Sequence, residues 1–170
     1  KFKEFILEKF RHLLDLNIKI AKNIPVSLDI FTYQAFLIEY LSPKNPYRGA
    51  YAYHGLGSGK SRTSIELSNA FIEYGFKILI LIPGALRDNY MIQLYLWGPP
   101  NIRIANYSRL DAEEKKLREK SANKVIEHYY DILTYNEKGL LDKLYKLLNT
   151  TTNLLENRLI IIDEMHDFVS

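Results

Sequence analysis

The chain contains 170 residues, of which 47% are hydrophobic and 25% are charged. These are ordinary values for a globular protein, so they exclude an intrinsically disordered chain, and the length suits one domain with a small appendage. The formal net charge of +3 is compatible with a polyanionic partner but lacks the strong bias of a dedicated nucleic-acid-binding tail. The sequence has no cysteine, which excludes disulfides, and its apolar runs are too short to span a bilayer, so we expect no membrane partner.

The first 30 residues predict a helical extension ahead of the main domain. Residues 1–15 place apolar side chains at helical spacing, with charged side chains on the opposite face. Residues 18–28 contain a proline and are typical of a connector. A second helix follows, for which Asp29 or Thr32 is a candidate cap, and it ends at Ser42-Pro43 because proline disfavours a helical residue before it.

A glycine-rich stretch follows residues 50–53, which we expect to form a strand. It reads Gly55-Leu56-Gly57-Ser58-Gly59 and continues with Lys60-Ser61 at the start of a helical pattern. Strand, glycine turn and helix start are together typical of a phosphate-binding loop. The glycines let backbone N–H groups surround phosphate oxygens, and the helix presents its own N–H groups and positive dipole end to the same anion. Lys60 would reach the β- and γ-phosphates, and the Ser61 hydroxyl would ligate Mg²⁺.

The general form of such a loop has a further glycine at the position of His54. A glycine- and serine-rich turn that happens to carry a lysine is therefore an alternative, and the rest of the chain has to decide between the two.

The remainder of the chain alternates helical and strand patterns. The predicted helices cover residues 60–74, 85–97, 111–124 and 140–148, and the predicted strands cover residues 77–82, 102–107, 129–134 and 158–162. Two of these strands are continuous apolar runs, as expected when both faces of a parallel strand are buried. The alternation predicts an α/β fold with a mostly parallel central sheet flanked by helices, in which ligands bind at the carboxyl ends of the strands.

The last predicted strand runs directly into Asp163-Glu164. Mg²⁺ takes few protein ligands, and a carboxylate at the end of a buried strand, opposite Ser61, suits it. Glu164 would orient and deprotonate the attacking water. A surface Asp-Glu pair is a credible alternative for these residues in isolation. Beside the glycine loop they indicate a site for a nucleoside triphosphate and Mg²⁺.

These residues carry a resemblance to a known family. Asp163-Glu164-Met165-His166 resembles the DExH box of superfamily 2 helicases and translocases, and Gly57-Ser58-Gly59-Lys60-Ser61 resembles their first motif. That motif often lacks the leading glycine, which removes the objection raised by His54. The resemblance implies a RecA-like domain that uses ATP and Mg²⁺, with Lys60, Asp163, Glu164 and His166 as catalytic residues.

Other segments follow in the order that the family shows. Gln34 resembles the upstream glutamine that reads adenine in this family. A carboxamide can pair with adenine N6 and N7, which gives this preference a physical basis. The alternative is that Gln34 is a polar helix residue that faces solvent. Arg87 and Asn89 lie in a segment that resembles one touching the nucleic-acid backbone, although Arg87 could equally be solvated. Tyr135 lies where the family has another turn that faces nucleic acid.

Within superfamily 2, the resemblance is closest to the Swi2/Snf2-like nucleoside triphosphatases of large cytoplasmic DNA viruses, of the poxvirus and giant-virus type. It covers residues 31–170, which would form the first RecA-like, ATP-binding domain, truncated after the DExH box. Residues 1–30 would form the N-terminal helical extension. The resemblance also implies a second RecA-like lobe beyond residue 170, which supplies arginine fingers, so that these residues alone would hydrolyse ATP poorly.

The resemblance implies nucleic acid as a partner, with DNA favoured over RNA, and subunits of a viral RNA polymerase or transcription factors as further partners. The corresponding locations are a cytoplasmic viral factory or the virion. The alternatives are an RNA helicase or transcription-termination ATPase, a P-loop kinase for a small molecule, and a non-hydrolysing scaffold in a transcription complex. Asp163-Glu164 followed by His166 argues for water rather than a second substrate as the phosphate acceptor.

Overall fold

The computed structural model describes residues 2–13, 31–53, 59–135, 137–148 and 157–165. The chain divides into two compact units, Lys1–Tyr53 and His54–Ser170. None of the helices in the described ranges is both long and apolar enough to cross a membrane.

The N-terminal unit contains helices α1 (Phe2–Lys9) and α3 (Thr32–Leu41), and residues 11–13 are also helical. Aromatic rings hold this unit together: Phe10 is buried against Phe36, with ring centroids 4.9 Å apart, and Tyr40 stacks on Tyr47 at 4.1 Å. The prediction of a helix at the N-terminus is confirmed for the described residues, and residues 14 and 15 lie outside them.

The start of α3 differs from the prediction. Thr32 is the first residue of the helix, and Phe31 occupies the capping position with its N–H donating to Gln34 Oε1 at 2.8 Å. Gln34 is the third residue of α3. Its side chain therefore accepts a hydrogen bond from an N–H group for which the helix backbone has no acceptor. The other predicted cap, Asp29, lies outside the described residues.

The C-terminal unit is a mixed α/β domain. Its helices are α4 (Lys60–Ile72), α5 (Arg87–Trp97), α6 (Ala112–Tyr129) and α7 (Leu140–Leu148), with short 3-10 helices η1 (Gly84–Leu86) and η2 (Tyr107–Arg109). Its strands are β1 (Lys77–Ile82), β2 (Tyr130–Thr134) and β3 (Arg158–Ile162). The strands form a three-stranded parallel sheet in the order β2-β1-β3. This confirms the predicted α/β class and is consistent with a RecA-like helicase domain.

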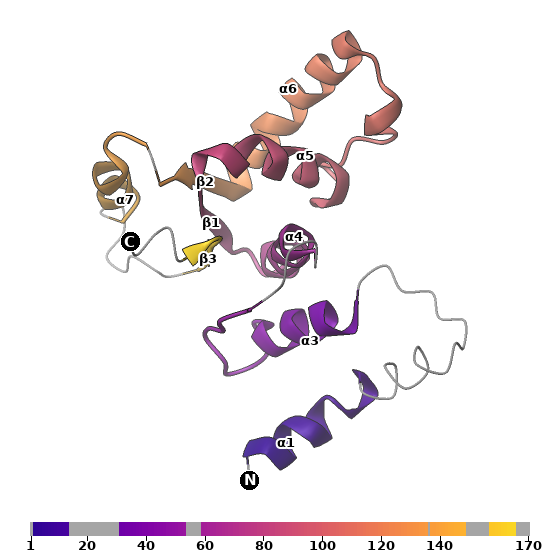
Figure 1. Ribbon diagram of the computed structural model, residues 1–170, viewed down its shortest axis with the longest axis vertical. Coiled ribbons are helices and arrows are strands. Elements are labelled where there is room, and N and C mark those ends of the chain that lie inside the picture. The colour runs from indigo at the N-terminus through magenta and orange to yellow at the C-terminus, as the bar shows by residue number, and fades with distance from the viewer. Residues whose placement is uncertain (1, 14–30, 54–58, 136, 149–156, 166–170) are drawn as a thin grey trace. The chain divides into compact units, whose positions relative to one another are not determined.

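The central strand β1 is apolar because both of its faces are covered. Leu79 and Leu81 form a core with Leu133, against which Leu140 and Leu144 of α7 pack. Successive strand residues point to opposite faces, so the buried isoleucines of β1 point the other way, and α4 contacts β1. Figure 1 shows α7 on one side of the sheet and α4 and α5 on the other.

Two predicted strands are wrong. Residues 50–53 are not paired into a sheet, and Tyr51 and Tyr53 are 74% and 91% exposed. Tyrosine favours strands because its ring packs on a half-buried sheet surface, and these two rings have no such surface to pack on. Residues 102–107 contain two buried isoleucines at alternate positions, which gave the strand pattern. Their backbone turns instead, with the Ile104 N–H donating to Tyr95 O at 2.8 Å and Asn106 in a left-handed conformation.

The predicted charged helix at 111–124 is confirmed and extends to Tyr129 in α6. Asp111 caps it, because its side chain accepts the Glu114 N–H at 2.8 Å.

Candidate active site

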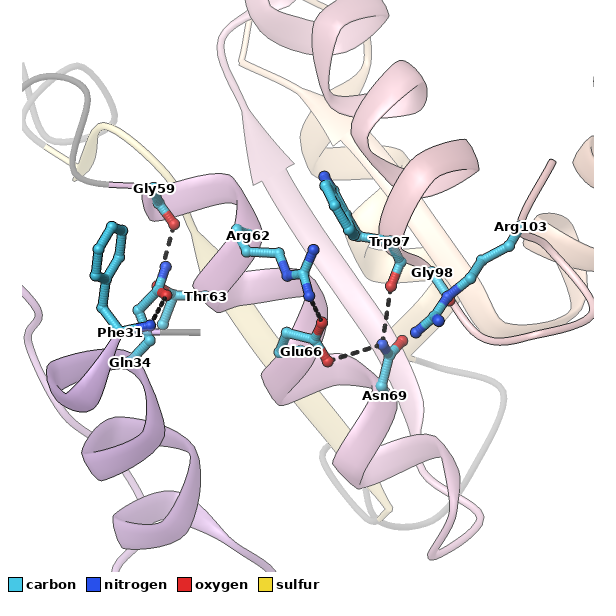
Figure 2. A network of polar contacts seen from close by, with 10 residues as sticks. All are labelled: Phe31, Gln34, Gly59, Arg62, Thr63, Glu66, Asn69, Trp97, Gly98 and Arg103. Carbon is cyan, nitrogen blue, oxygen red and sulfur yellow. Dashed lines mark hydrogen bonds and ion pairs between the residues drawn. The ribbon is translucent and has the colours of Figure 1, made fainter. Parts of the chain in front are cut away.

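Helix α4 begins with a glycine conformation that suits a phosphate loop. Gly59 has φ 77° and ψ 33°, a left-handed conformation that glycine adopts without steric cost, and it is the residue that precedes the first turn. The Thr63 N–H and hydroxyl both donate to Gly59 O, at 3.0 and 3.1 Å, which fixes that turn (Figure 2). Gly55, Leu56, Gly57 and Ser58, the predicted body of the loop, lie outside the described residues.

The two predicted carboxylates follow the end of β3. The Asp163 N–H donates to Leu81 O at 2.9 Å, which continues the pairing with β1. The chain then turns at Glu164, whose φ of 49° lies in the left-handed region and whose N–H donates to Asp163 Oδ1 at 3.0 Å. Non-glycine residues in this conformation are uncommon and cluster at functional sites. Because of this turn, the chain leaves the strand direction at the second carboxylate.

Lys60 and Glu164 meet in the structure although they are 104 positions apart in the sequence. Lys60 Nζ lies 2.5 Å from Glu164 Oε1, and the two side chains are 31% and 25% exposed. The hydrogen bond to Glu164 raises the pKa of Lys60; burial opposes this rise, and the charges of both carboxylates favour it. Lysine is therefore held in its charged form at the start of α4, where a phosphate group would also be favoured by the helix dipole.

Asp163 lies in a setting that disfavours its charge. Burial raises the pKa of its carboxyl group, the N–H of Glu164 and the charge of Lys60 lower it, and the charge of Glu164 raises it further. A divalent cation would offset this cost, and carboxylate and hydroxyl oxygens are the ligands that Mg²⁺ prefers. The residue types at Asp163 and Ser61 thus fit a magnesium site.

Two hydroxyl groups, one of them buried, support the first turns of α4. The Ser64 hydroxyl donates to Ser61 O at 2.8 Å, and the hydroxyl of Tyr90, from α5, lies 3.1 Å from Ser64 Oγ. Since Ser64 uses its proton on Ser61, Tyr90 donates to Ser64. Burial raises the pKa of Tyr90, so its hydroxyl keeps the proton that this bond needs. The sequence did not reveal this role, because Tyr90 reads as one residue of an apolar helix face.

A second polar network joins α4 to α5 (Figure 2). The Arg62 guanidinium lies 3.6 Å from the ring centroid of Trp97 and pairs with Glu66 at 2.7 Å. The Asn69 side chain donates to Trp97 O at 3.0 Å, and Arg103 Nε donates to Gly98 O at 2.5 Å. The contacts of Arg62 and Asn69 with Trp97 hold α4, the helix that begins with Lys60 and Ser61, against α5.

The other predicted site residues lie in different settings. Arg87 and Asn89 are exposed in the first turn of α5, as a contact with a nucleic-acid backbone requires. Tyr135 is half-buried, and its hydroxyl donates to Asp163 O at the end of β3. Gln34 is buried in the N-terminal unit, where it binds the Phe31 N–H. His166 lies outside the described residues.

Comparison with known proteins gives relatives that are named helicases. A candidate ATP-dependent RNA helicase, R563, of Acanthamoeba polyphaga mimivirus is 31% identical over 179 residues, covering 99% of this chain and 30% of that protein. A second from the same virus, R350, is 32% identical over 153 residues, covering 86% of this chain and 17% of that protein. A candidate helicase of Invertebrate iridescent virus 3, 087L, is 24% identical over 155 residues, covering 82% of this chain and 15% of that protein.

The chain therefore spans less than a third of the length of these curated relatives. No protein-family model matches it, and no solved structure matches it. The relatives support a helicase family that occurs in giant viruses and other large DNA viruses.

Proposed function

We propose that this chain forms the ATP-binding part of a nucleic-acid-dependent ATPase of the helicase and translocase type. The observation that carries the proposal is the meeting of Lys60, at the start of α4, with Glu164, directly after Asp163 at the end of β3. A helix N-terminus with a lysine, facing two strand-end carboxylates, is the arrangement that binding and hydrolysis of a nucleoside triphosphate require. The names of the relatives support the same class.

Each residue has a role that its position supports. Lys60 and the N–H groups at the start of α4 would bind the phosphates, and Ser61 and Asp163 would hold Mg²⁺. Bound Mg²⁺ supplies positive charge to the phosphate oxygens during hydrolysis. Glu164 would orient the attacking water and accept its proton. Tyr90, through Ser64, keeps the backbone of Ser61 in place.

The ion pair between Lys60 and Glu164 implies that nucleotide binding comes before the activation of water. While Lys60 binds Glu164 Oε1, neither group is available for its role: the lysine does not face a phosphate, and the carboxylate is held by a positive charge. Nucleotide binding would draw Lys60 to the phosphates and leave Glu164 to act on water. The pair would in this way keep Glu164 from acting on water when no substrate is bound.

The finer assignment is also a proposal. Asp163-Glu164-Met165-His166 and the glycine loop favour a DExH-box protein of the Swi2/Snf2-like group, with transcription as its process. Gln34 would read adenine, and Arg87 and Asn89 would contact nucleic acid. A second RecA-like lobe, polymerase or transcription-factor subunits, and a viral factory or virion location belong to the same proposal.

RNA is the second candidate substrate, because the relatives R563 and R350 are named as RNA helicases. Measuring whether DNA or RNA stimulates the ATPase activity of the full-length protein would separate the two.

The experiment that tests the proposed function is Glu164→Gln in the full-length protein. We expect ATP to remain bound while turnover is lost, because glutamine cannot accept the proton of water. Turnover at the wild-type rate would contradict the assignment of Glu164. Absence of ATPase activity in the wild-type protein, together with full biological activity of Glu164→Gln, would instead support a non-hydrolysing scaffold.

A further inference from the structure

Tyr135 connects the carboxyl ends of all three strands. It directly follows β2, and its N–H donates to Ile82 O, at the end of β1, at 3.1 Å. Its hydroxyl donates to Asp163 O, directly after β3, and lies 3.3 Å from Leu81 O. The Leu81 carbonyl also accepts the Asp163 N–H, so three hydrogen bonds converge where the two predicted carboxylates leave the sheet.

The peptide that Tyr135 holds is the one between Asp163 and Glu164. Its carbonyl oxygen accepts the Tyr135 hydroxyl, and its N–H donates to Asp163 Oδ1 at 3.0 Å. Glu164, which follows, has φ 49°. For a residue with a Cβ, this conformation is strained, so the surrounding contacts must hold it. Tyr135 supplies a bond from outside the segment to that peptide plane.

We propose that Tyr135 is a positioning residue that sets the orientation of the Asp163–Glu164 peptide, and through it the directions of both carboxylates. This inference rests on the proposed function. The peptide plane is shared by the two residues, so its rotation would move the metal-binding carboxylate and the water-activating carboxylate together. The sequence alone predicted that Tyr135 contacts nucleic acid, whereas this proposal assigns its hydroxyl to the nucleotide site.

The test is Tyr135→Phe in the full-length protein. Phenylalanine keeps the ring and the backbone N–H bond to Ile82 O, and it removes only the hydroxyl. Tyr107→Phe is the matched control, because it also removes one tyrosine hydroxyl, which here binds Glu119 of α6 at 2.5 Å. Three quantities are measured for each variant: amide hydrogen exchange of the segment 158–165 without nucleotide, nucleotide affinity with and without Mg²⁺, and turnover.

We expect Tyr135→Phe to speed exchange at the Glu164 amide by at least about tenfold, because the peptide is then free to rotate. Residues that orient metal ligands typically change metal affinity or activity by about 10- to 100-fold. The Mg²⁺ concentration that gives half-maximal nucleotide binding should rise, and kcat should fall, by a factor in this range. Nucleotide affinity without Mg²⁺ should stay within about twofold of wild type, and Tyr107→Phe should resemble wild type in all three quantities.

Unchanged exchange at Glu164, or an unchanged Mg²⁺ requirement, would overturn the inference. A Tyr135→Phe protein that does not fold would also overturn it, because the Tyr135 hydroxyl would then be required for the stability of the sheet. If the wild-type protein hydrolyses no ATP, the proposed function fails. The exchange measurement still decides whether Tyr135 holds the peptide, so the two failures are distinguishable.

Discussion

The ion pair between Lys60 and Glu164 has a measurable cost for nucleotide binding. A nucleotide that takes Lys60 must first break this contact, in which the two atoms lie 2.5 Å apart. Hydrogen bonds to charged groups contribute about 1.5 to 3 kcal/mol, whereas exposed ion pairs contribute about 0.2 to 1 kcal/mol. The two side chains are 31% and 25% exposed, so solvent screens the pair in part, and we take about 1 kcal/mol as its contribution.

Glu164→Gln removes the charge of this partner and keeps a neutral amide in its place. The variant should therefore bind nucleotide about fivefold more tightly than the wild type, the factor that corresponds to about 1 kcal/mol. The assay is equilibrium titration of a fluorescent ATP analogue in EDTA, so that metal binding does not contribute. The gain should shrink as the salt concentration rises, because salt screens the pair that the substitution removes.

Asp163→Asn is the matched control for this experiment. It removes one negative charge from the adjacent position, but Asp163 contributes to Lys60 only through its charge and not through a hydrogen bond. The gain from Glu164→Gln beyond that from Asp163→Asn measures the pair itself. Equal gains in the two variants, or weaker binding by Glu164→Gln, would refute the idea that Lys60 has to leave Glu164.

Two further predictions concern stability. A Cβ added at Gly98 would lie 2.6 Å from Leu94 O, so we expect Gly98→Ala to destabilise the domain by about 1 to 3 kcal/mol. A Cβ added at Gly84 would have nothing within 4 Å, so Gly84→Ala should change stability by less than about 0.5 kcal/mol. Thermal unfolding compares the two variants, and equal shifts of their midpoints would contradict the steric argument. Burial and the hydrogen bond to Glu119 raise the pKa of Tyr107 to about 12 from its ordinary value of 10.0. The unfolded chain therefore loses this proton first, and the contribution of Tyr107 to stability is complete below pH 10 and declines as the pH rises toward 12. Urea unfolding between pH 9 and pH 11 should show a shallower decline for Tyr107→Phe than for wild type, and identical slopes would count against this cause.

The parts of the fold that follow from local pattern could be predicted from the sequence. The apolar run at 77–82 forms β1, because a strand covered on both faces has no polar positions. The run at 158–162 forms β3 and places Asp163 and Glu164 directly after its carboxyl end, the edge at which ligands bind in parallel sheets. The meeting of Lys60 with Glu164 does not follow from this rule, because residues 50–53, the strand expected before the glycine loop, are not paired into a sheet.

Features that depend on contacts between distant segments could not be predicted. The alternation at Ile102 and Ile104 arises because both side chains are buried in a turn, and burial alone does not distinguish a turn from a strand. To predict the role of Gln34, the first residue of α3 had to be known. The sequence left this open, because Asp29 and Thr32 were both candidate caps. The hydrogen bonds from the Tyr135 hydroxyl to carbonyl groups at the strand ends could not be predicted from the sequence, because a phenylalanine at this position would give the same hydrophobic pattern.

Trp97 is the only tryptophan of these 170 residues, and it ends α5 beneath the Arg62 guanidinium. It is 39% exposed, so its indole borders both solvent and the helix that begins with Lys60. In this stretch of chain, all tryptophan emission therefore comes from a single ring in contact with that helix. Its emission maximum, and its accessibility to a collisional quencher, can follow any movement of α4 against α5 during nucleotide binding without an attached label.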